Sequence, residues 1–159
     1  MTNTVLSGLK GTIDMSFKLL GDFMEVCPED IWAETSGGWP VWQQVYHIVT
    51  AVDFFLDAPD APEAQYLAPG EITSLRVKAE NTMDKDEIRA AFTRAVEKVN
   101  ACVAGLTDAA LAEPNKGVFA RARMEMNMAG TLSMLAAHTL YHLGGCDAAL
   151  RNHGIPGVF

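Results

Sequence analysis

Apolar residues recur at steps of three and four positions in four long segments of this chain. In the first segment, residues 4–26, the recurring positions are Leu6, Leu9, Ile13, Phe17, Leu20 and Met24. This spacing places them on one face of an α-helix, because about 3.6 residues complete each turn. The same pattern predicts helices over about 40–56, 84–106 and 129–153, and β-strand signals are too sparse for a sheet. The sequence therefore predicts an all-α protein, with one four-helix-bundle domain over residues 1–159.

Particular residues mark the ends of these helices. Pro40 is expected at the first position of the second helix, where its missing N–H is not needed. Asp84, followed three residues later by Glu87, predicts a reciprocal cap at the start of the third helix. Gly154 is expected to end the fourth helix.

The connections between the helices are expected to be largely irregular. Residues 28–32 and 107–113 each predict one short helical turn, and residues 36–38 predict a loop. Residues 72–77 are interpreted as a short extended piece. Residues 119–128 alternate with a period of two and are interpreted as extended chain or loop.

The composition narrows the classes of partner. The chain of 159 residues is 49% apolar, which excludes a disordered protein and allows one sizeable core. Its net charge is −8 and its twelve Lys and Arg residues are scattered, so neither nucleic acid nor an anionic membrane surface is an expected partner. The chain shows no membrane span, no signal-peptide core in its first residues and only three cysteines without framework spacing. A cytoplasmic location with reduced thiols is expected.

Two of the four histidines, His138 and His142, lie four positions apart in the last predicted helix. At this spacing two imidazoles share a helix face and can bind one ion. The face also carries Leu135, so the rings point toward the core, where unpartnered histidines cost free energy. Without a third candidate ligand, the pair alone would favour two satisfied core histidines. His47, in the apolar second helix, is a third candidate ligand, whereas His153 lies in a last turn where the helix dipole favours positive charge.

The sequence around these histidines resembles the DinB/YfiT-like superfamily. The resemblance rests on Gly38-Trp-Pro-Val-Trp-Gln-Gln-Val-Tyr-His47, His138-x-x-x-His142-x-Gly144 and Leu150-Arg151-x-x-Gly154. It implies an up-and-down variant of the four-helix bundle and a divalent transition metal, zinc or nickel, bound by His47, His138 and His142. Many relatives carry glutamine where this chain has Gly145, which predicts either more space beside the ion or lost chemistry.

Three histidines leave at least one coordination position open, as catalytic zinc sites do. The resemblance extends to thiol-dependent transferases and isomerases and to hydrolases. The leading hypothesis is therefore a metal-dependent hydrolase or low-molecular-weight-thiol S-transferase acting on a small molecule. The alternative is a non-catalytic bundle that binds metal or a small ligand for sensing, stress response or assembly, and a third reading has no metal at all.

No catalytic side chain is assigned beyond the ligands. Asp53, Glu80 and Glu125 are candidate general bases but are more typical of solvated carboxylates. Cys146, one turn after His142, is a candidate soft ligand and more typically a small core residue. The methionines at positions 124, 126, 128 and 134 could suggest copper binding, but they are more typical of core filling or of a dimer interface. The second helix is apolar on several faces, which predicts that it is either deeply packed or partly covered by a second subunit. Because of the second alternative, a homodimer is expected.

Overall fold

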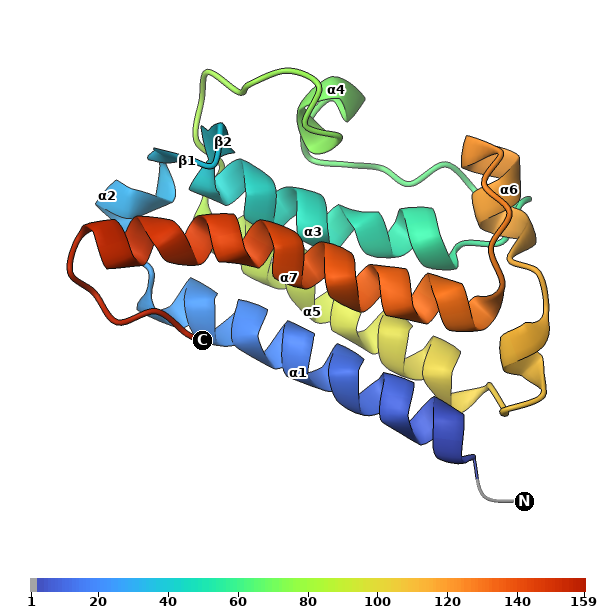
Figure 1. Ribbon diagram of the computed structural model, residues 1–159. Coiled ribbons are helices and arrows are strands. Elements are labelled where there is room, and N and C mark those ends of the chain that lie inside the picture. Colours follow the sequence, from blue (N-terminus) through green and yellow to red (C-terminus); the bar gives the residue numbers. More distant parts are fainter. Residues whose placement is uncertain (1–2) are drawn as a thin grey trace.

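The computed structural model describes residues 3–159 and is built from four long helices (Figure 1). They are α1 (Thr4–Val26), α3 (Val41–Leu56), α5 (Lys85–Ala104) and α7 (Met128–Asn152). Helix α7 packs on both α1 and α3, and α3 also packs on α5. The all-α bundle predicted from the apolar periodicity is confirmed, and the four helices occupy the predicted parts of the chain.

Short elements fill the connections. They are α2 (Glu29–Trp32), β1 (Thr35–Ser36), β2 (Trp39–Pro40), α4 (Gly70–Thr73), the 3-10 turn η1 (Ala110–Ala112) and α6 (Lys116–Ala122). Strands β1 and β2 form an antiparallel hairpin whose turn is Gly37-Gly38. Both glycines have positive φ, 59° and 97°, which suits a two-residue hairpin turn and which residues with a side chain rarely adopt.

The helix starts differ in detail from the predictions. Pro40 precedes α3 with φ −54° and ψ 141°, because it belongs to β2 and pairs with Thr35. Asp84 caps α5, and its carboxylate accepts a hydrogen bond of 2.8 Å from the N–H of Asp86. The return bond to Glu87 does not form within the described residues, so only half of the reciprocal cap is present.

Two connections that were predicted to be extended are partly helical. Residues 70–73 form α4, and residues 116–122 form α6 after Asn115, whose side chain accepts from the N–H of Val118. The predictions failed because these helices are too short to show a 3.6-residue period. Among the residues of α6, the buried ones are adjacent, Gly117 and Val118, so no helical stripe exists to be recognised.

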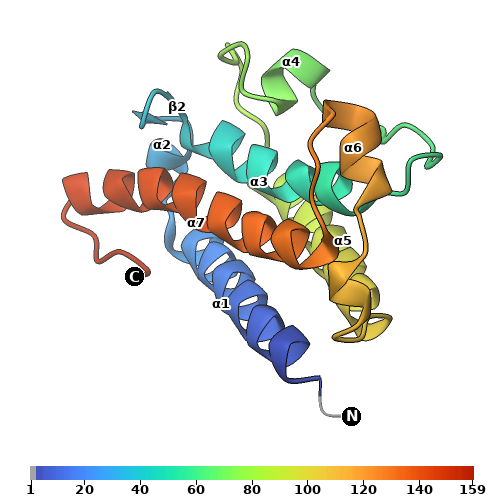
Figure 2. The ribbon, with the colours of Figure 1, turned by 45° about the vertical axis from the view of Figure 1, so that its right-hand side comes forward.

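Helix α3 is the centre of the fold. Twelve of its sixteen residues are buried, and α5, α7, α6 and α4 all contact it. Figures 1 and 2 show the segment with α4 passing over the side of α3 that faces away from α1. Most of α3 is therefore covered within one chain, which is the deep packing that its apolar sequence predicts. No helix among the described residues combines the length and apolarity needed to cross a bilayer.

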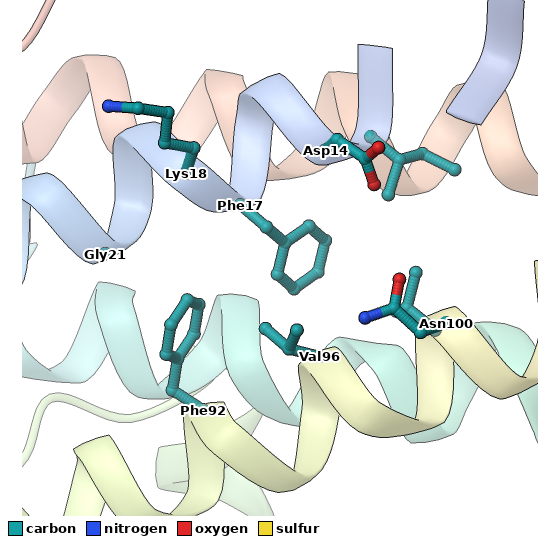
Figure 3. Close-up of a pocket in the computed structure, with 9 residues that line it drawn as sticks. Asp14, Phe17, Lys18, Gly21, Phe92, Val96 and Asn100 are labelled. Carbon is teal, nitrogen blue, oxygen red and sulfur yellow. The ribbon is translucent and has the colours of Figure 1, made fainter. Parts of the chain in front are cut away.

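Helices α1 and α5 leave a groove of about 280 Å³ between them (Figure 3). Phe17 and Phe92 face one another across it, with ring centroids 6.1 Å apart. Asp14, Lys18 and Asn100 lie at its edge. None of the residues that line this groove is a histidine or a cysteine.

Candidate metal centre

The structure brings three of the four histidines together. His47 comes from α3, and His138 and His142 come from successive turns of α7, which packs beside α3 (Figure 2). The ring centroids of every pair are 4.8 Å apart. One nitrogen from each ring lies within 4.8 Å of the other two, so the three side chains could hold one ion. The three residues selected from sequence thus form one cluster.

A backbone carbonyl determines which nitrogen of His47 carries its hydrogen. Nδ1 of His47 lies 2.8 Å from the carbonyl oxygen of Thr73, at the end of α4. A carbonyl can only accept, so Nδ1–H donates and the lone pair of the neutral ring is on Nε2. That Nε2 lies 2.9 Å from Nε2 of His138. Such an outer hydrogen bond is what usually orients a metal-binding histidine.

The cluster is held in its neutral form. Burial lowers the pKa of His138 to about 3, with further lowering from the other two rings. Burial and the neighbouring His47 lower the pKa of His142 to about 4. The pKa of His47 is lowered by burial as well, against the opposing effect of its bond to Thr73. Neutral imidazole is the form that binds metal ions, so near pH 7 protons do not compete for this site.

The protein alone does not satisfy the cluster. Since Nε2 of His47 is an acceptor, the metal-free site has His138 donating from its own Nε2. Nδ1 of His138 is then a buried nitrogen with no hydrogen-bond partner in the part of the chain that the structure describes. Leaving a buried polar atom unpaired costs about 1–3 kcal/mol. Nδ1 lies across the imidazole ring from Nε2, which faces His47, so it is the convergence of one nitrogen from each ring that marks a possible ion site.

A cavity of about 440 Å³ opens beside His47 and His138. Its other lining residues are Thr50, Ala51, Phe54, Phe55, Tyr66, Gly70, Thr73 and Ser74. The ring of Phe55 contacts that of His138, with centroids 5.9 Å apart. No Asp, Glu, Lys or Arg is among the lining residues, so the space beside the histidines is aromatic, apolar and without charge.

The candidate general bases lie elsewhere. Asp53 is paired with Lys98 at 2.6 Å and faces a neighbouring pocket. Glu80 and Glu125 line two further, separate cavities. Cys146 is fully buried against the start of α3, 3.8 Å from the carbonyl of Val41, and burial raises the pKa of its thiol. It lies outside the histidine cluster and is a core residue.

The interpretation of Gly145 as added space beside the ion is wrong. A Cβ at this position would lie 3.0 Å from Oε1 of Gln44. The carbonyl of Gly145 accepts a 2.6 Å hydrogen bond from the hydroxyl of Ser36 in β1. Glycine here lets the β1–β2 hairpin approach α7, and the hairpin rather than a substrate occupies the space.

Sequence reasoning missed the residues that surround the histidines. Thr73 and Tyr66 belong to a connection rich in proline, where no periodicity marks which residue faces the core. The fourth histidine, His153, was expected to be structural. It lies at the end of α7 with Nε2 2.6 Å from a carboxylate oxygen of Glu34, away from the cluster.

The chain is similar to known proteins both in sequence and in fold. The sequence model of the family described as the DinB superfamily matches residues 13–145. The crystal structure of a DinB-like protein from Bacillus cereus ATCC 10987 is similar over 96% of this chain and 97% of that one. The TM-score is 0.58 and the identity is 21%, so this similarity concerns the fold. No curated protein matches the chain.

Proposed function

Because this chain belongs to the DinB superfamily, whose members bind metal ions, we propose that it binds one divalent transition ion through His47, His138 and His142. The observation that carries the proposal is the convergence of three neutral imidazoles, each with one nitrogen within 4.8 Å of the other two. Zinc and nickel are the proposed ions, since imidazole suits both and softer or harder ligands are missing from the cluster.

We propose further that the site is catalytic. An ion held by three histidines with an open position lowers the pKa of bound water to about 7 or polarises a thiol. In this chain the Thr73 carbonyl orients His47, and Phe54, Phe55 and Tyr66 line the adjacent cavity. These features support a hydrolase or a low-molecular-weight-thiol S-transferase.

The lining of the cavity supports a class of substrate. Away from the ion, an ionised group moved into a space without a charged partner loses its hydration and gains nothing in return. The cavity offers aromatic faces, hydroxyl groups and backbone atoms, and none of its lining residues is charged. We therefore propose that the reacting group of the substrate lies against the ion and that the rest of the substrate, which fills the cavity, is uncharged and largely apolar.

One observation favours the non-catalytic alternative. No carboxylate lines the cavity, so a proton would have to be moved by the ion's own ligand or by the substrate. A bundle that binds metal for sensing or assembly needs no such group. Turnover of an uncharged thiol or ester by the metal-loaded protein supports the enzyme. Stoichiometric metal with no turnover supports the alternative.

The first test is metal content. Wild-type protein purified without a metal-affinity step should contain a near-stoichiometric divalent ion by plasma mass spectrometry, and His138→Ala should not. His153→Ala is the matched control, because that histidine is exposed and bound to Glu34. Wild-type protein that neither carries an ion nor binds added zinc or nickel would overturn the proposal.

A further inference from the structure

Three side chains of α3 hold the covering segment, residues 57–83, in place. They are Gln43, Tyr46 and His47, which lie on one stripe of the helix because they are three and four positions apart. The hydroxyl of Tyr46 accepts a 2.7 Å hydrogen bond from the N–H of Leu67. His47 donates to Thr73. His47 is therefore both a candidate metal ligand and one of the residues that hold this segment against α3.

Gln43 makes the most extensive of these contacts. Its side chain is fully buried. Nε2 donates to the carbonyls of Ile72 at 2.9 Å and Val77 at 2.7 Å, and Oε1 accepts from the N–H of Ala79 at 3.0 Å. Both donor hydrogens and the oxygen of the amide are thus used. Two of the bonds lie beyond the end of α4 and one lies within it, next to Thr73.

Helix α4 depends on such outside contacts. It has four residues, too few to be stable alone. Its end is closed by hydrogen bonds from Leu75 N–H to Ile72 and from Arg76 N–H to Glu71, 3.1 and 2.8 Å long. This closure places Leu75 at φ 56°, where glycine is usual and other residues cost about 1–2 kcal/mol. The segment is therefore locally strained and is kept in position by α3.

We propose that Gln43 is a positioning residue of the metal site, acting through α4. It holds α4 so that the Thr73 carbonyl meets Nδ1 of His47, and this keeps the Nε2 lone pair directed at His138 and His142. The inference rests on the proposed metal binding. Loss of the Gln43 bonds would free Thr73 to move, and His47 would then exchange between its two tautomers and orientations.

The chain contains a closely matched control. Gln44 is the next residue of α3, is also buried, and also donates from Nε2 to two backbone carbonyls, those of Ser36 and Trp39. Its bonds hold the β1–β2 hairpin instead of α4. Gln43→Leu and Gln44→Leu therefore remove the same chemical group from the same helix, and only the first should disturb the histidines.

The test is the dissociation constant of Zn²⁺, measured by competition with a chromophoric chelator. Losing an outer-shell partner typically weakens metal binding about 10–100-fold, and this loss is expected for Gln43→Leu. Gln44→Leu should stay within a factor of about three of wild type, well below that outer-shell effect. Equal weakening in both variants, or none in Gln43→Leu, would overturn the inference.

A second readout needs no metal and so separates this inference from the proposed function. In metal-free protein, ¹⁵N NMR should show His47 as the Nδ1–H tautomer in wild type and in Gln44→Leu, and as a mixture in Gln43→Leu. If Gln43→Leu does not fold, Gln43→Glu replaces it, since a carboxylate keeps the acceptor for Ala79 but cannot donate to Ile72 and Val77. A single Nδ1–H tautomer in the folded Gln43 variant would overturn the inference even if wild-type protein binds zinc.

Discussion

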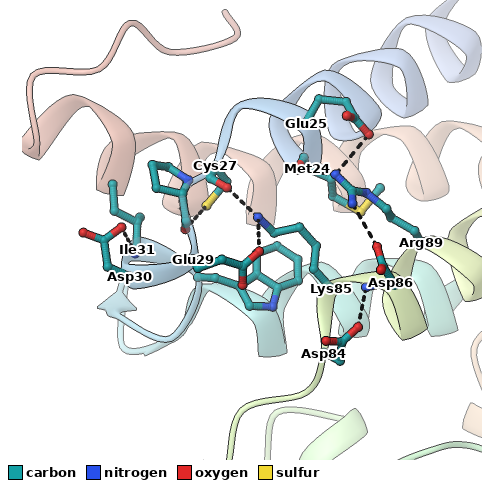
Figure 4. Close-up of polar contacts among 12 residues, drawn as sticks. Met24, Glu25, Cys27, Glu29, Asp30, Ile31, Asp84, Lys85, Asp86 and Arg89 are labelled. Atoms are coloured by element: carbon teal, nitrogen blue, oxygen red, sulfur yellow. Dashed lines mark hydrogen bonds and ion pairs between the residues drawn. The ribbon is translucent and has the colours of Figure 1, made fainter.

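Two regions of this molecule bury polar side chains, and they do so in opposite ways. At the junction of α1, α2 and α5, Lys85 is nearly buried yet fully partnered (Figure 4). Its ammonium group donates to the carbonyl of Cys27, lies 3.0 Å from a carboxylate oxygen of Glu29 and sits 5.2 Å from the centre of the Trp32 ring. At the histidine cluster the groups are neutral, face one another and include an unpaired nitrogen.

The difference separates a polar cluster whose charges are paired from one that could hold an ion. Arg89, beside Lys85, also has a buried unpaired atom, Nε, but its other two nitrogens reach Asp86 and Glu25 at 3.0 and 3.3 Å. The charges of the junction are met by opposite charges and carbonyls. Among residues 3–159 the hydrogen-bond partners of the clustered histidine rings are the Thr73 carbonyl and one another, and one nitrogen of each ring could bind a shared ion.

The comparison predicts a steep acid sensitivity that originates at the histidines. Below pH 6.5, the ordinary pKa of histidine, the unfolded chain binds a proton at His138, whereas the folded metal-free protein does so only near pH 3. The stability from neutral His138 is complete above pH 6.5 and is lost as the pH falls toward 3, by up to about 1.4 kcal/mol per pH unit. Urea unfolding of metal-free protein between pH 7.5 and 5 measures this slope.

The control for that slope is His138→Leu, which removes the titrating group and keeps the position apolar. The variant should show a shallower pH dependence than wild type. Identical slopes would mean that His138 titrates normally in the fold, and the contrast with the Lys85 junction would then fail.

A smaller effect is expected when the junction itself is changed. Lys85→Met keeps most of the apolar stem but leaves the Cys27 carbonyl without its charged donor. A hydrogen bond to a charged group contributes about 1.5–3 kcal/mol, so the free energy of unfolding should fall by roughly 2 kcal/mol. Zinc affinity should not change, because the junction and the histidines share no residue. A loss below about 0.5 kcal/mol would be the value of an exposed ion pair and would contradict the structural role given to Lys85.

The smallest effect is expected at Gly145, which lies on α7 one turn after His142. Alanine gains about 1 kcal/mol of helix propensity over glycine, but its Cβ would approach Oε1 of Gln44 to 3.0 Å. These effects oppose one another, so Gly145→Ala should change the free energy of unfolding by less than about 1 kcal/mol and leave zinc affinity unaltered. A tenfold change in affinity would place Gly145 in the metal site after all.

The sequence by itself was enough to predict the four helices and the three histidines. A long amphipathic helix repeats its apolar stripe over several turns, and α1 shows it six times from Leu6 to Met24. His138 and His142 share a face because the helix determines that spacing, and His47 was selected because nothing in its apolar surroundings explains a lone histidine. Short elements such as α4 and α6 carry too few residues to display a period, and they were misassigned.

The tertiary structure alone decided what surrounds those histidines. Thr73, Gln43 and Tyr66 come within reach of the cluster through contacts between residues that are far apart in sequence, for which no local spacing provides a signal. The same holds for Gly145, whose position on the helix predicted space, whereas the β1–β2 hairpin fills it. Helical periodicity is a property of neighbouring residues, but the orientation of His47 and the uncharged cavity beside it exist only once α3, α4 and α7 have packed together.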